Sequence, residues 1–180
     1  SSRQTLKDSI AALAANGSTA GQIGLAWGWY LVSPNFSSLW TGDSTPAAYD
    51  PQRTLKVVIL MTDGEFNTPF CKDVIAQDAM TGSGGADSHI NCNATNGDAF
   101  NQSVQLCNAM KQQGVVVYTV GFNLGANPST GGAGIDTAIE VLRNCATNEN
   151  THFYNANSGT DLKDAFKAIG RDITRLRIAR

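Results

Sequence analysis

The sequence lacks several features that would assign it to a common class of protein. None of its apolar runs approaches the ~20 residues that a membrane-spanning helix needs, and no signal peptide is recognisable. Charged residues make up only 16% of the 180 residues and the formal net charge is −2, so a basic surface for nucleic acid is not expected. We interpret the arginines in the last ten residues as complementing the carboxyl end of a terminal helix.

Cysteine and histidine are also scarce, and their spacing argues against a zinc centre. The chain has two histidines and four cysteines, with no C-x-x-C spacing. An even number of cysteines, two of them in loop-like sequence, predicts two disulfides and an oxidising compartment. Four cysteines allow three pairings, of which we favour Cys71–Cys92 with Cys107–Cys145. The alternative is four reduced thiols in a cytoplasmic protein.

The most informative stretch runs from Leu55 to Glu65, where an apolar run ends in Thr62-Asp63-Gly64. A run of this length, ended by turn residues, predicts a strand buried on both faces of a parallel sheet. Asp63 would then lie at the carboxyl end of that strand, where open α/β sheets bind their ligands. The alternative role for Asp63 is to hydrogen-bond the turn that it starts.

A second loop carries Thr19, just before the apolar stretch 20–32, which predicts a buried helix with Trp27 and Trp29 in the core. The Thr19 hydroxyl is a hard oxygen donor of the kind that Mg²⁺ and Mn²⁺ accept. Capping the following helix is its alternative role, and the two roles are compatible. Ser18 and Glu65 are weaker candidates for the same cation.

The rest of the chain alternates between helix and strand, around a long irregular insertion at about 65–96. Helices are predicted at 5–15, 98–113, 135–145 and 158–173. The apolar run 115–122 predicts a second buried parallel strand, and a short strand is predicted at 152–155. This alternation predicts one α/β domain over residues 1–180, with a Rossmann-like open parallel sheet flanked by helices. The predicted core face of the last helix consists of Leu162, Phe166 and Ile169.

Thr19 and the Thr-Asp-Gly turn resemble two parts of the metal-ion-dependent adhesion site of a von Willebrand factor A domain. The third part in that family, an Asp-x-Ser-x-Ser at the end of the first strand, is absent from this sequence. Longer stretches resemble the A-domain region of TadG-like proteins, which serve the bacterial tight-adherence (Flp) pilus assembly system. They are the segments 19–29, 61–68, 106–111, 117–122 and 176–178.

The resemblance implies a von Willebrand factor A-type sheet that is incomplete at its amino terminus, so that the chain is the carboxyl-terminal part of a domain. It implies a non-enzymatic adhesion or assembly module in the periplasm or at the cell surface, tethered by an upstream membrane segment. Such a module would hold Mg²⁺ or Mn²⁺, with Ca²⁺ less favoured, at Thr19 and Asp63. The expected partner is a pilus or envelope protein with an acidic residue.

Partner contacts are expected from side chains on loops that could flank this site, namely Phe66, Asn67, Trp40 and Tyr49. The sheet edge left open by the missing strand would pair with a missing fragment or another copy of the chain. Two alternative functions remain. One is a structural envelope module with a non-functional metal site, in which the insertion and the aromatic loops make the contacts. The other is a metal-dependent hydrolase, for which Glu65 is the candidate general base.

Overall fold

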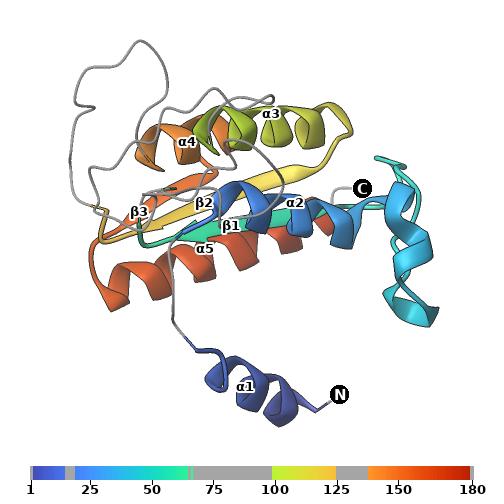
Figure 1. The fold of residues 1–180 in the computed structure, drawn as a ribbon, viewed down its shortest axis with the longest axis horizontal. Helices are drawn as coiled ribbons and strands as arrows, with labels where there is room; N and C mark the ends of the chain where they lie inside the picture. Colours follow the sequence, from blue (N-terminus) through green and yellow to red (C-terminus); the bar gives the residue numbers. More distant parts are fainter. Residues whose placement is uncertain (1, 15–18, 65, 67–98, 125–137, 179–180) are drawn as a thin grey trace, which may run out of the picture.

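The three strands in the part of the chain that the structure describes form one parallel sheet, in the order β1-β2-β3. The computed structural model describes residues 2–14, 19–64, 66, 99–124 and 138–178. Within these residues the strands are β1 (Val57–Thr62), β2 (Val116–Phe122) and β3 (Phe153–Ala156). The register pairs Thr62 with Gly121 and Gly121 with Asn155, so the carboxyl ends of all three strands meet at one edge of the sheet (Figure 1).

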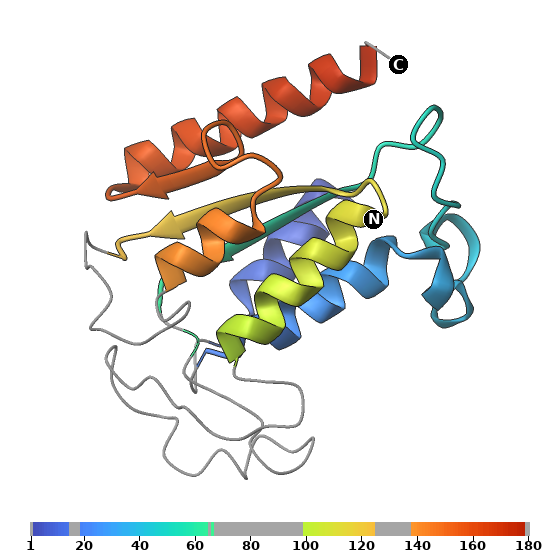
Figure 2. The ribbon, with the colours of Figure 1, turned by 90° about the horizontal axis from the view of Figure 1, so that it is seen from above.

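Helices cover both faces of the sheet, as the alternating pattern predicts. The helices α2 (Gly21–Val32), α3 (Ala99–Gln112) and α4 (Ala138–Cys145) contribute to the larger core on one side, and α5 (Gly159–Ile178) covers the other (Figure 2). Two short 3-10 helices, η1 (Pro34–Leu39) and η2 (Gly42–Ser44), precede β1, and α1 (Arg3–Ala11) begins the chain. The fold is therefore a Rossmann-like open parallel sheet flanked by helices.

Burial differs sharply between the two longer strands. In β2 the five residues between Val116 and Phe122 are all buried, so the prediction of a strand covered on both faces is correct there. The same prediction is wrong for β1, where Ile59 is 39% and Met61 is 43% exposed. The reason is position, because β1 is one of the two edge strands of the described sheet and α5 packs on β2 and on the other edge strand, β3.

Two helices also expose side chains that their sequences place in the core. In α2 the side chain of Trp27 is 54% exposed, whereas Trp29 is half-buried and donates a hydrogen bond from Nε1 to the Tyr49 hydroxyl, at 2.8 Å. In α5 the side chain of Phe166 is 41% exposed, although Ile169 is buried. The predictions for Trp27 and Phe166 are wrong because a surface helix buries only one stripe of its circumference, even where its other residues are apolar. Trp29 packs against the core.

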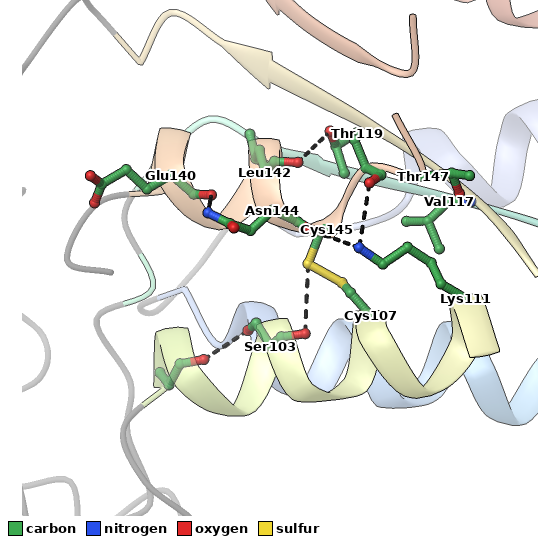
Figure 3. Close-up of a disulfide and its surroundings, with 12 residues drawn as sticks. Ser103, Cys107, Lys111, Val117, Thr119, Glu140, Leu142, Asn144, Cys145 and Thr147 are labelled. Carbon is green, nitrogen blue, oxygen red and sulfur yellow. Dashed lines mark hydrogen bonds between the residues drawn. A yellow bond between two sulfur atoms is a disulfide. The ribbon is translucent and has the colours of Figure 1, made fainter. Parts of the chain in front are cut away.

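A disulfide links the two helices that lie side by side on one face. Cys107 of α3 and Cys145 of α4 are bonded and fully buried, which confirms one of the two predicted pairs (Figure 3). One turn along α3, the Lys111 ammonium donates to the backbone oxygen of Asn144 at 2.7 Å, near the end of α4. Cys71 and Cys92, with nearly all of the predicted insertion, lie outside the described residues.

The last helix begins where the sequence indicates. The Ser158 hydroxyl accepts a hydrogen bond from the Asp161 backbone N–H at 3.1 Å, and the Asp161 carboxylate accepts one from the Asn157 N–H at 3.2 Å. This reciprocal capping satisfies N–H groups that a helix start leaves unpaired. In the part of the chain that is described, no helix combines the length and the apolar composition that crossing a membrane requires.

Candidate functional site

At the carboxyl end of β1, the buried side chain of Thr62 forms hydrogen bonds with the turn that follows the strand. Its Oγ1 donates to the Gly64 backbone oxygen at 2.9 Å and accepts from the Gly64 N–H at 3.2 Å. Thr62 thus closes the turn with its own hydroxyl, and Asp63 lies exposed at the tip. The carboxylate of Asp63 therefore stands at the sheet edge where the parallel strands end, as the sequence predicts.

The hydroxyl of Thr19 lies next to this turn. A Cβ added to Gly64 would be 3.7 Å from the Thr19 Oγ1, so that oxygen lies beside the turn, about one methyl group away from its backbone. Thr19 itself is half-buried and lies just before α2. The structure therefore brings together the two loops that the candidate site requires, although they are far apart in sequence. The weaker candidates Ser18 and Glu65, and the candidate partner contact Asn67, lie outside the described residues.

Phe66 holds these two loops in place. It is 3% exposed and stacks on Phe100 of α3, with 6.0 Å between the ring centroids. A Cβ on Gly21, the first residue of α2, would lie 2.2 Å from two carbons of the Phe66 ring. The ring therefore packs directly on the Gly21 backbone and fixes the chain after Asp63 against the start of α2. The prediction of Phe66 as an exposed partner contact is wrong, and its role is positioning.

The other two aromatic candidates lie at the opposite end of β1. The Trp40 Nε1 donates to the Tyr30 backbone oxygen at 3.0 Å. The Tyr49 ring is 5.3 Å from the ammonium of Lys56, which immediately precedes β1. The segment that carries both residues lies at the end of the sheet away from Asp63 (Figure 1). The expectation that Trp40 and Tyr49 flank the site is therefore wrong. Both side chains make contacts near the amino end of β1 instead.

Buried polar groups elsewhere in the sheet have structural partners. The Tyr118 hydroxyl of β2 donates a short hydrogen bond to the Asp172 carboxylate of α5, and the His152 ring lies 4.5 Å from the Tyr118 ring, centroid to centroid. The pKa of Tyr118 is raised well above its ordinary value, mainly because the hydroxyl is buried and to a lesser extent because of this hydrogen bond. Burial lowers the pKa of Lys56, whose ammonium donates to two backbone oxygens at 2.6 Å. His152 therefore packs beside the Tyr118 ring.

The chemistry that the site offers is that of hard oxygen ligands. Asp63 supplies a carboxylate and Thr19 a hydroxyl, both of which suit Mg²⁺ or Mn²⁺. Two protein ligands would leave most of an octahedral shell to water or to a partner. Across the described residues there is no group of three or more His, Cys, Asp or Glu side chains that could hold a metal ion. Asp63 and Thr19 are therefore candidate ligands of an open site, and the described residues contain no closed metal cage.

Comparison with known proteins supports the fold. Neither protein-family models nor curated protein sequences match the chain. Among solved structures the chain is similar to the pilus adhesin SpaC from Lactobacillus rhamnosus GG, with a TM-score of 0.58 and 14% sequence identity. The similarity covers 94% of this chain and 21% of the adhesin chain, so this chain spans about a fifth of that protein. The class that fold and site define is an open parallel α/β domain, of a kind also found in a pilus adhesin.

Proposed function

We propose that this chain is a non-enzymatic adhesion or assembly module of a bacterial pilus system, of the von Willebrand factor A type and similar to TadG-like proteins. The observation that carries the proposal is the Thr19 hydroxyl beside the Asp63–Gly64 turn, at the carboxyl edge of a parallel sheet. The likeness in fold to a pilus adhesin agrees with it. The buried Cys107–Cys145 disulfide agrees with a place in the periplasm or at the cell surface, because disulfides persist in oxidising compartments.

In this proposal a divalent cation joins the module to its partner. Asp63 and Thr19 hold Mg²⁺ or Mn²⁺, directly or through water, and an acidic side chain of the partner replaces one water in the open part of the shell. The exposed position of Asp63 leaves room for that approach. Because Phe66 packs on Gly21, the two ligand loops keep their separation when the partner carboxylate arrives.

Solution binding of Mn²⁺ separates this function from a structural module with a non-functional metal site. We expect Asp63→Ala to abolish the binding that wild-type protein shows in a titration followed by electron paramagnetic resonance. The matched control is Asp43→Ala, since Asp43 is an exposed acid in η2, at the other end of the sheet. Equal Mn²⁺ binding by the two variants and the wild type would favour the structural module, whose contacts would come from the insertion and the aromatic loops.

The outer edge of β1 is a second place where we propose that the chain meets another segment. Among the described strands β1 pairs with β2 alone, so one of its edges offers unpaired backbone groups to a missing fragment or to another copy. Sedimentation velocity over a range of concentrations tests this pairing. A monodisperse monomer that melts cooperatively would contradict it.

A further inference from the structure

Among the described helices, none covers the outer half of one sheet face, although the sheet is parallel. A helix with its side chains is about 10 Å wide and strands lie about 4.8 Å apart, so one helix covers roughly two strands. On the face that carries Tyr118 and Val120, α5 packs on β3 and β2. The side chains of β1 that point to this face, Ile59 and Met61, are exposed. Parallel sheets are normally covered on both faces, so within the described residues this surface lacks a second helix.

The flank of α5 that faces β1 continues this apolar surface. Ile173 of α5 and Val57 of β1 line the same cavity near the amino end of β1. Phe166 lies two helical turns before Ile173, on the same side of the helix, and is 41% exposed. Ile59, Met61 and Phe166 are therefore the exposed large apolar side chains around an uncovered strip between β1 and α5, which we name the β1 strip.

The chain also contains a helix whose apolar side is uncovered. Every residue of α1 is exposed, including Leu6 at 60% and Ile10 at 59%, and Leu13 just beyond the helix is 76% exposed. These three residues recur at helical spacing, which is the pattern of a helix that packs on one face. Figures 1 and 2 together place α1 on the side of the sheet that carries α5, below β1.

We propose that the β1 strip is the docking surface for α1 of the same chain, in a closed arrangement where Leu6, Ile10 and Leu13 cover Ile59 and Met61 beside Phe166. The sizes agree, since α1 is about 14 Å long and β1 about 20 Å. The segment between Ala11 and Gly21 can reach about 30 Å when extended, so α1 can dock without displacing α2. The segment also contains Thr19, so docking restrains a ligand of the candidate metal site from its amino-terminal side.

Oxidation of Met61 by hydrogen peroxide, followed by peptide mass spectrometry, tests the closed arrangement directly. Met110 is fully buried and serves as an internal reference for the folded state. The test variant is Leu6→Gln/Ile10→Gln, which removes the apolar side of α1. The control is Lys7→Gln/Asp8→Gln, which introduces the same residue twice on the rest of the helix and leaves the net charge unchanged.

If α1 is docked about nine-tenths of the time, Met61 in wild type and control oxidises roughly tenfold more slowly than in the test variant. Met110 stays protected in all three proteins, so unfolding of a variant would be recognised at once. Equal Met61 rates in test and control variants would overturn the proposal. Protection that disappears on dilution and in the test variant would show that α1 of a second copy occupies the strip, which would also overturn docking within one chain.

Discussion

Replacing Gly21 by alanine tests whether Phe66 positions the two loops of the candidate site. The added Cβ would lie 2.2 Å from Cε1 and Cζ of Phe66 and 2.4 Å from Cδ1, distances at which the ring has to move. The ring is 3% exposed and stacked on Phe100, so its movement disturbs packing in the core. Gly21→Ala therefore adds one methyl group and disturbs one contact, the packing of the Phe66 ring on residue 21.

The expected cost follows from two opposing effects. Inserting a methyl group into a packed core costs about 1–3 kcal/mol, whereas alanine in place of glycine in a helix favours folding by about 0.5–1 kcal/mol. We expect a net destabilisation of about 1–2 kcal/mol, which lowers Tm by about 2–8 °C for a protein of this size. Gly24→Ala in the same helix is the matched control, because a Cβ there meets nothing within 4 Å, and it should stabilise the protein.

Urea denaturation of the single and double variants measures the contact itself. Trimming the ring in Phe66→Leu should relieve part of the clash, so the double variant should be more stable than the sum of the single effects predicts, by about 0.5–3 kcal/mol. Direct packing of Phe66 on Gly21 would be contradicted if Gly21→Ala is as stable as Gly24→Ala, or if the effects of Gly21→Ala and Phe66→Leu are additive.

Further predictions concern buried groups away from the site. Tyr118→Phe should cost about 1–3 kcal/mol near neutral pH, because it removes a hydrogen bond to the carboxylate of Asp172. The folded state raises the pKa of Tyr118 above its ordinary 10.0, so above that pH the folded protein retains a proton that the unfolded chain loses, and stability falls as pH rises. Urea titrations between pH 7 and 11 should show a shallower alkaline loss in Tyr118→Phe than in wild type, and parallel curves would contradict this. Removing the disulfide in Cys107→Ala/Cys145→Ala should cost about 4 kcal/mol on the chain-entropy estimate for its separation of 38 residues, and a loss below about 1 kcal/mol would argue against its role.

The features that could be predicted from sequence are those set by local or periodic patterns. The apolar run in β2 predicts a strand covered on both faces, and Ser158 with Asp161 predicts the start of α5. The alternation of helices and strands is sufficient to predict the parallel sheet, since consecutive strands that are joined through a helix run in the same direction. Asp63 was likewise placed correctly, because a turn that ends a buried parallel strand lies at the carboxyl edge of the sheet.

The features that could not be predicted depend on neighbours distant in sequence. The apolar run in β1 resembles that in β2, and the exposure of Ile59 and Met61 follows from the edge position of the strand. Phe66 stands alone in irregular sequence, and its burial depends on contacts with Gly21 and Phe100, which no local pattern encodes. The signal in the sequence was Gly21 at the start of α2. A helix start does not require glycine there, so its presence indicates that another group packs closely on that backbone.

The central claim is that Thr19 and Asp63 together bind a divalent cation. Its most direct test is an anomalous difference map from crystals soaked in Mn²⁺, with Asp63→Ala crystals treated in the same way. We predict a peak within coordination distance of the Asp63 carboxylate and the Thr19 hydroxyl, or one water layer away, and its absence in the variant. Mn²⁺ peaks elsewhere in the crystal with none between these two side chains would contradict the claim.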